Sequence, residues 1–307
     1  MRQLKLIFSA LMVLGWIQFI STTATASTLV AQLKVSTFNV KWYGYKGDGE
    51  EWRKVRNQER DGTLLDFMSK SIADSDVIFF QEIADTARLA QLMTHFQMIC
   101  YTYAFKSDMH QHVVACMKNI YRFEVAMDDN NLELENTATG FLRPVLHGIL
   151  VRAADGAKLA HLFSVHLKAG PYHSHIRIKQ LEALVQYIDQ RKSPYPAIIA
   201  GDFNNYVTSS VDSRFSDVDY FNQIFAKTSS HIYRINNPWP YTYNNTKYSN
   251  HFDHFWVSQR VQLLAQVAVY GACNSDDKTP GSYLNLEYYN QAVSDHCPVS
   301  VYVGVYH

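Results

Sequence analysis

Residues 196–204 read Pro-Ala-Ile-Ile-Ala-Gly-Asp-Phe-Asn, a short apolar run that passes through a glycine into an acid and an amide. Such a run is typical of a buried strand, and the glycine after it favours a turn. The pattern therefore predicts a strand whose end presents Asp202 and Asn204.

Similar runs recur along the chain and alternate with amphipathic stretches. They predict strands at 33–40, 76–80, 147–152, 158–167, 252–257, 261–270 and 298–305, and helices at 51–73, 86–96 and 176–190. Asp155-Gly156 predicts a hairpin turn. The polar residues at or beside strand ends, which loops can gather into one cleft, are Asn39, Glu82, His166, Asp202, Asn204 and His296.

The N-terminal 26 residues have the pattern of a secretory signal peptide. Arg2 and Lys5 precede an apolar run at 6–20, and small residues end at Ala26, after which we expect cleavage. The alternative is a membrane anchor, but the run of about 15 residues is shorter than the roughly 20 that span a bilayer. We therefore expect a secreted or periplasmic protein, without stable membrane insertion, whose single domain covers 27–307.

Charge does not identify the substrate. The chain has 28 basic and 28 acidic residues, and the N-terminal segment holds two of the basic ones, so the mature chain carries −2. The chain therefore has no overall positive charge that would indicate nucleic-acid binding. A cleft that binds a divalent cation neutralises phosphate locally, however, so nucleic acid is not excluded.

The four cysteines indicate disulfides rather than a zinc cage, because no Cys-x-x-Cys pair is present. Cys100 and Cys116 lie in apolar segments on either side of a polar connection at 106–111, which suits a bridge across a hairpin. Cys273 and Cys297 would then form the second bridge.

Six short motifs occur in an order that resembles the endonuclease/exonuclease/phosphatase superfamily: Ser36-Thr37-Phe38-Asn39-Val40, Phe80-Gln81-Glu82-Ile83, Ser164-Val165-His166-Leu167, Gly201-Asp202-Phe203-Asn204, Phe252-Asp253-His254 and Ser294-Asp295-His296. Each motif alone is weak, but the ordered set is specific. The resemblance spans residues 36–303. It implies an α/β fold similar to deoxyribonuclease I, a four-layer sandwich of two packed, mainly antiparallel sheets flanked by helices.

The resemblance also implies a divalent-cation site and a group that activates water. Glu82 would be the principal metal ligand, with Asn39 close by and Asp295 completing the site. Oxygen ligands of this kind suit Mg²⁺, with Mn²⁺ or Ca²⁺ as alternatives. Asp202 and Asn204 would hold and deprotonate the attacking water.

Basic residues would handle the phosphate. His296 would stabilise or protonate a phosphate oxygen while Asp253 holds its imidazole; the alternative is that His296 is the general base and Asp202 supports the transition state. His166 would donate to the phosphate or to the leaving oxygen. Arg143 and Lys168 would bind phosphate, although a solvent-facing arginine is the alternative for Arg143.

One departure from the family pattern concerns His166. Nucleases of this family have a tyrosine and an acid where this chain reads Met109-His110-Gln111-His112, so the partner of His166 stays unassigned. His110 or His112 could contribute to binding instead, although an exposed loop histidine is the alternative that we favour. The aromatic loop 238–243 could stack on bases or simply be a packed loop, which we favour.

Three functions fit these residues. The first is a metal-dependent nuclease acting on DNA, or on RNA, as a monomer. The second is a phosphodiesterase or phosphatase acting on a phospholipid head group, as sphingomyelinases do, or on a small phosphate ester. The third is a binding module without catalysis, which is disfavoured because each motif keeps its reactive residue. The export signal, the disulfides, the length and Arg143-Pro144 favour the nuclease.

Overall fold

The computed structural model describes residues 27–45, 57–102, 111–126 and 143–307, so the predicted signal peptide at 1–26 lies outside the described residues. Within these residues, the strands form two large mixed sheets and one short hairpin. No helix in the described ranges is long and apolar enough to cross a membrane.

The first sheet has the order β13-β15-β1-β2-β4-β3, with β14 also paired to β15. Its strands are β1 (Leu29–Tyr43), β2 (Val77–Ile83), β3 (Met98–Tyr101), β4 (His112–Lys118), β13 (Val261–Leu263), β14 (Ala268–Val269) and β15 (Val299–Tyr306). β1 and β2 run parallel and the other pairs are antiparallel.

The second sheet has the order β5-β6-β7-β8-β12-β9. Its strands are β5 (Tyr121–Val125), β6 (Leu146–Arg152), β7 (Lys158–His166), β8 (Ala197–Asp202), β9 (Ile232–Arg234) and β12 (Asp253–Ser258). β7 and β8 are parallel, and their register pairs His166 with Asp202. Antiparallel β12 begins where β8 ends and pairs Asp253 with Asp202. Three site residues therefore stand on three neighbouring strands.

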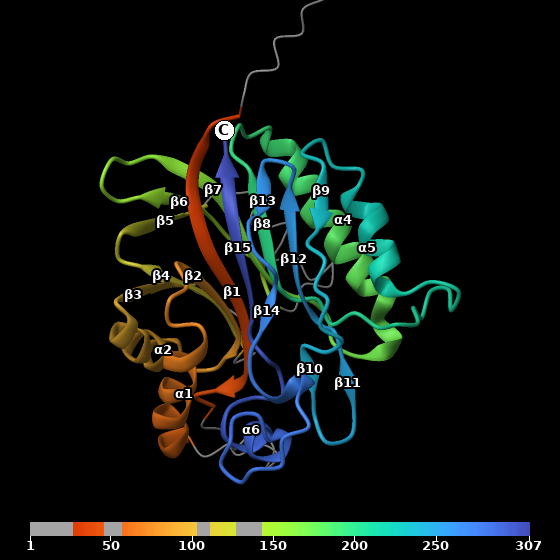
Figure 1. Cartoon of the computed structure of the whole chain (residues 1–307). Coiled ribbons are helices and arrows are strands. Elements are labelled where there is room, and N and C mark those ends of the chain that lie inside the picture. The colour runs from red at the N-terminus through yellow and green to blue at the C-terminus, as the bar shows by residue number, and fades with distance from the viewer. Residues whose placement is uncertain (1–26, 46–56, 103–110, 127–142) are drawn as a thin grey trace, which may run out of the picture.

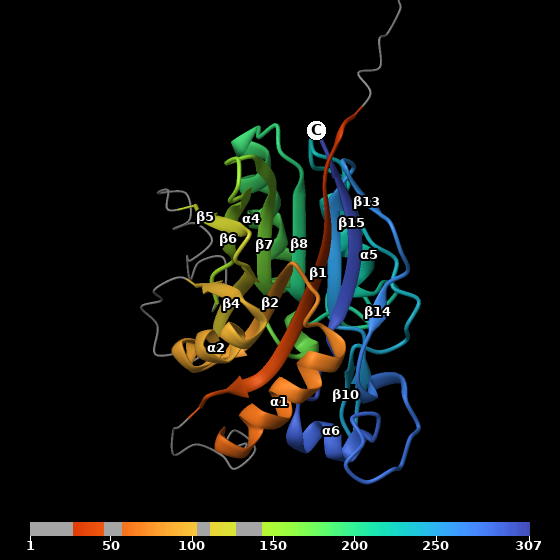
Figure 2. The same cartoon turned by 60° about the vertical axis from the view of Figure 1, so that its left-hand side comes forward.

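Helices cover the outer face of each sheet, as Figures 1 and 2 show. The first sheet carries α1 (Asn57–Ser71), α2 (Thr86–Met93) and α6 (Leu286–Ala292), and the second carries α4 (Ser174–Arg191) and α5 (Asp217–Phe225). One apolar cluster lies between the two sheets, and one lies under each set of helices. Three apolar interfaces separating four layers confirm the predicted sandwich.

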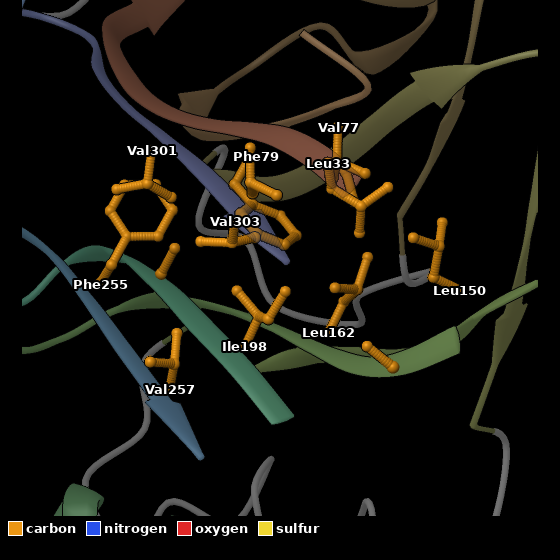
Figure 3. Packing of buried hydrophobic residues seen from close by; sticks show 14 of the residues in the cluster. Leu33, Val77, Phe79, Leu150, Leu162, Ile198, Phe255, Val257, Val301 and Val303 are labelled. Atoms are coloured by element: carbon orange, nitrogen blue, oxygen red, sulfur yellow. The ribbon is translucent and has the colours of Figure 1, made fainter. Parts of the chain in front are cut away.

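The interface between the sheets consists mainly of aliphatic and phenyl side chains. Figure 3 shows Phe79 and Val303 of the first sheet facing Ile198 and Leu162 of the second. Burial of these side chains is the main force that fixes the distance between the sheets. The strands that carry the polar groups at their ends are positioned by this apolar layer.

The sequence predictions hold for most of the regular elements. The predicted strand at 261–270 is wrong in one respect, because it is interrupted between β13 and β14. From Leu263 to Ala268 this segment advances five residues while its partner β15 advances three, from Val303 to Ser300, so the extra residues loop out. The hairpin expected around Cys100 and Cys116 corresponds to β3 and β4. The prediction missed β5, β9, β10 (Tyr243–Asn244), β11 (Ser249–Asn250), α5 and α6, and 51–56 of the predicted first helix lie outside the described residues.

Both predicted disulfides are present. Cys100 and Cys116 are directly paired residues of β3 and β4. The second bridge joins Cys273 to Cys297, which follows His296 directly.

A leucine in the layer between the sheets should contribute far more stability than one at the sheet edge. Leu162 is 0% exposed and Leu263 is 40% exposed. We expect Leu162→Ala to lower the free energy of unfolding in urea by about 2–5 kcal/mol, through lost burial and the cavity that remains. The matched Leu263→Ala change should stay within about 0.5 kcal/mol. Equal losses would contradict the assigned core.

Candidate active site

Asn39, near the end of β1, is hydrogen-bonded to residues of both sheets. Its amide Nδ2 donates to Glu82 Oε1 at 3.2 Å and to Asp202 Oδ2 at 3.0 Å. Glu82 belongs to β2 of the same sheet, whereas Asp202 ends β8 of the other. One fully buried amide thus holds two carboxylates from different sheets.

Two imidazoles face the Asp202 carboxylate. His166 Nε2 lies 3.5 Å from Asp202 Oδ2, and His296 Nε2 lies 3.7 Å from the same oxygen. These distances exceed those of a good hydrogen bond. The other oxygen, Oδ1, accepts the backbone N–H of Asn204 at 2.8 Å, which fixes the carboxylate in its turn.

Asp253 orients His296, as the resemblance implied. His296 Nδ1 lies 2.9 Å from Asp253 Oδ2, and Asp253 is fully buried. Burial lowers the pKa of His296, but the charges of Asp253 and Asp202 outweigh it and raise that pKa to about 10. His296 is therefore a cation at neutral pH.

The pKa shifts of Asp202 and His166 favour the uncharged form of each side chain, whereas that of His296 favours the charged form. Burial raises the pKa of Asp202 to about 7, even though His296 acts to lower it. Burial, and then the charge of Arg143, hold the pKa of His166 well below its ordinary value. An acid poised near neutrality and a cationic histidine suit a general base and a phosphate-stabilising group, respectively. This favours the assignment in which Asp202 deprotonates the water and His296 stabilises a phosphate oxygen, over the one in which His296 is the general base.

The partner of His166 stays open. Its buried Nδ1 has no hydrogen-bond partner among the described residues, and His110 lies outside them. His112 begins β4, and Gln111 Oε1 accepts from Arg143 Nη1 at 2.6 Å. Gln111, in the stretch that departs from the family pattern, thus binds Arg143.

Arg143 is buried, which overturns the solvent-facing alternative. Its guanidinium donates to the carbonyl oxygens of His166 and Leu167 at 3.2 and 2.6 Å, so it supports the end of β7 while it lines the cleft. Lys168 also lines the cleft, and its backbone N–H donates to Gln180. Burial and the charge of Arg143 lower the pKa of Lys168.

The metal candidates lie on the same side of the cleft. Glu82 and Asp295 both line it, and burial and the charge of Asp295 raise the pKa of Glu82. Lys41 Nζ lies 3.3 Å from Asp295 Oδ2. Among the described residues, no three His, Cys, Asp or Glu side chains cluster as a metal cage. Two carboxylates that repel each other fit a hard cation such as Mg²⁺, which needs only one or two protein carboxylates.

Asn39, which the resemblance placed near the metal, uses both ends of its amide in hydrogen bonds within the protein. Its Oδ1 accepts the backbone N–H of Lys41 at 3.0 Å, and its nitrogen faces the carboxylates. In this geometry Asn39 positions Glu82 and Asp202 by donating to them.

Strained backbone surrounds the site. Lys41, Trp42, Glu82 and Asn204 have φ angles of 42°, 52°, 59° and 48°, and all four line the cleft. Left-handed conformations are costly for residues other than glycine and tend to persist where function needs them. Gly201, with φ 145°, is required for close packing, since a Cβ there would lie 2.0 Å from the Val165 carbonyl oxygen.

A cleft of about 740 Å³ opens over these groups. One side is aromatic, and we call Tyr206, Tyr243, Tyr248 and Phe252 the aromatic wall. Phe252 lies 5.5 Å from Tyr206 and 5.0 Å from Tyr243 between ring centroids. Of the predicted aromatic loop only Tyr243 lines the cleft. Trp239 donates to the Val267 carbonyl, but Trp239 and Tyr241 are 41% and 39% exposed, so the packed-loop interpretation holds only in part.

Sequence reasoning missed several contributors. Lys41, Tyr206 and Tyr248 line the cleft without having been singled out, although Lys41 and Tyr206 each lie two residues from a motif residue. Buried Arg60 of α1 donates to the carbonyl oxygens of Lys41 at 2.9 Å and of Val293 at 3.1 Å. It thereby ties the end of β1 to the segment before His296, a role that no local motif signals.

The profile of the Endonuclease/Exonuclease/phosphatase family matches residues 37–296. No curated protein matches the sequence of the chain. Among solved structures, the human Nocturnin catalytic domain with bound sulfate is 15% identical, covering 90% of this chain and 95% of that one at a TM-score of 0.58.

Two further solved structures have the same fold. D. rerio TDP2 complexed with a single strand DNA product is 17% identical, covering 89% of this chain and 99% of that one at a TM-score of 0.58. The endonuclease/exonuclease/phosphatase from Bacteroides vulgatus is 12% identical, covering 90% and 99% at a TM-score of 0.61.

Removing the charge of Asp253 should change the titration of His296. Because Asp253 is the main charge that keeps the imidazole protonated, we expect Asp253→Asn to bring the pKa of His296 from about 10 down toward 6.5. Titration followed by NMR of imidazole-labelled protein measures this shift. Asp212→Asn, a change at an acid that pairs with Arg214 on the surface, is the control and should leave His296 unchanged.

Proposed function

The chain belongs to the endonuclease/exonuclease/phosphatase family, and on that premise we propose that it is a divalent-metal-dependent phosphodiester hydrolase that cleaves nucleic acid, DNA or alternatively RNA. The family consists of phosphoric ester hydrolases that generally use divalent metals. The observation that carries the proposal is Asp202, which lies between His166 and His296 on the floor of a cleft with cationic and aromatic sides.

Asp202 is the proposed general base. With its pKa near 7, its carboxylate accepts the proton of the attacking water as the water oxygen bonds to phosphorus. The Asn204 backbone N–H and the Asn39 amide hold the carboxylate during this step. The bond from phosphorus to the leaving oxygen then breaks opposite the new bond.

His296 is the proposed stabiliser of the developing charge. As a buried imidazolium held by Asp253, it offers Nε2–H to a phosphate oxygen or gives its proton to the leaving oxygen. Neutral His166, whose Nε2 faces the same side of Asp202, would donate to a second phosphate oxygen.

Glu82 and Asp295 would hold the divalent cation, for which Mg²⁺ is the proposed ion and Mn²⁺ or Ca²⁺ are alternatives. A bound cation would supply positive charge to the phosphate oxygens. Asn39 would keep Glu82 in place by donating to its Oε1.

The sides of the cleft support a nucleic acid substrate. Lys41, Arg143 and Lys168 provide positive charge for a phosphate backbone, and the aromatic wall provides ring faces on which bases can stack. A small phosphate ester would use the floor and leave the wall unoccupied.

A second candidate function follows from an exposed apolar rim. Tyr172 is 81% exposed and Val207 is 79% exposed. Their segments are joined by reciprocal hydrogen bonds between Ser174 and Ser210 at 3.2 and 2.9 Å. Exposed apolar groups beside a phosphate site favour a phospholipid head group as the alternative substrate.

Export to an oxidising compartment is part of the proposal. The two disulfides are compatible with a secreted or periplasmic protein. We further propose that the mature enzyme acts as a monomer and is not inserted in the membrane.

The reaction class can be tested with protein that comprises residues 27–307. We expect Mg²⁺-dependent nicking of plasmid DNA that a chelator abolishes, and Asp202→Asn should lower kcat by roughly 10²- to 10⁴-fold because it removes the base. Single-stranded RNA, sphingomyelin vesicles and phosphomonoesters are assayed in parallel. Turnover of sphingomyelin with intact nucleic acid would replace the nuclease by the lipid alternative, and full activity of Asp202→Asn would refute the proposed base.

The aromatic wall should contribute to substrate binding through stacking. We expect Tyr248→Ala to raise KM for a single-stranded oligonucleotide roughly 5- to 100-fold, with a much smaller effect on a strand that has abasic positions. Tyr248→Phe should behave as wild type. Tyr302→Ala, at a similarly exposed tyrosine on β15, is the control. A change that affects both strands equally would show that the wall does not contact bases.

A further inference from the structure

The segment that carries His296 has little regular structure to hold it. It lies between the end of α6 at Ala292 and the start of β15 at Val299. Its sheet contact is an isolated bridge between His296 and Tyr243. The position of the imidazole therefore depends on individual contacts.

The Cys273–Cys297 disulfide is the covalent contact among them. Cys297 follows His296 directly, and Cys273 lies in the short η5 helix (Ala272–Asn274). Both sulfur-bearing residues are buried. The bridge thus fixes the backbone one residue from the imidazole against an element that is remote in sequence.

Hydrogen bonds also connect the two bridged segments to the strand pair β10 (Tyr243–Asn244) and β11 (Ser249–Asn250). Cys297 N donates to the Thr242 carbonyl at 2.7 Å. Asn244 bonds both segments that the disulfide joins: its Nδ2 donates to the Cys273 carbonyl at 2.9 Å, and its backbone N donates to the Asp295 carbonyl at 2.9 Å. The disulfide therefore joins η5 to the catalytic segment, and the hydrogen bonds of Thr242 and Asn244 hold both beside Tyr243 of the aromatic wall.

The second disulfide of the chain provides a contrast. Cys100 and Cys116 face each other within a continuous ladder, in which Ile99 pairs with Met117 and Tyr101 with Ala115. The strand pairing on both sides of this bridge should hold that geometry when the bridge is removed. The two disulfides close loops of 16 and 24 residues, so their entropic contributions to stability should be similar.

We propose that the Cys273–Cys297 disulfide is a positioning element of the active site, which keeps His296 aligned with Asp253 and Asp202. This inference rests on the proposed role of His296 in catalysis. A displacement of a reacting group by about 1 Å can cost roughly 100-fold in rate, so loss of this bridge should reduce turnover far more than loss of the other.

The test compares two double variants, C273A/C297A and C100A/C116A, at a temperature where both are folded by circular dichroism. For C273A/C297A we expect kcat on plasmid DNA to fall roughly 10- to 100-fold, with KM changed by less than about 2-fold. For C100A/C116A we expect a similar decrease in Tm with kcat close to wild type. Equal kcat values in the two variants would overturn the inference.

A second readout does not depend on the substrate. The His296 imidazole should give one sharp NMR signal in the wild type and in C100A/C116A, and a broadened or multiple signal in C273A/C297A. If wild-type protein cleaves no substrate, the proposed function fails while this signal still tests the alignment. An unchanged signal in C273A/C297A would refute the inference. Should that variant not fold, C100A/C116A measured before and after reduction isolates the loss of the Cys273–Cys297 bridge.

Discussion

The hydrogen bond from Asn39 Nδ2 to Asp202 Oδ2 links the two sheets at the place where the reactive groups gather. Asn39 lies near the end of β1 and Asp202 ends β8, so the contact requires both sheets to pack face to face in one register. The apolar layer between the sheets provides that packing, and the polar site lies at its edge. The geometry of the floor therefore depends on the core between the sheets as much as on the polar residues themselves.

Electrostatics then assigns different roles to similar groups. His296 and His166 both face Asp202, yet His296 has its Asp253 partner while Arg143 lies close to His166. The same buried site therefore holds one imidazole charged and the other neutral. Asp202 lies between these two imidazoles, and burial raises the pKa of its carboxyl group to about 7.

Motif residues and supporting residues differed in how far they could be predicted. Short polar motifs at strand ends identified Glu82, Asp202 and His296, because a buried apolar strand followed by a polar turn is visible in local sequence. Arg60, Tyr206 and Tyr248 could not be predicted in this way. Their roles come from contacts between segments far apart in the chain, which local periodicity does not encode.

The sequence by itself determined the alternation of strands and helices, the order of the motifs and the pairing of the cysteines. Only the tertiary structure decided that Asn39 donates to carboxylates, that Arg143 is buried against the end of β7, and that the charge of Lys41 is shared with Asp295. The physical reason is the distance along the sequence over which each property is determined. Strand formation follows from neighbouring side chains, whereas hydrogen-bond direction and pKa depend on burial and charges that only the packed sheets bring together.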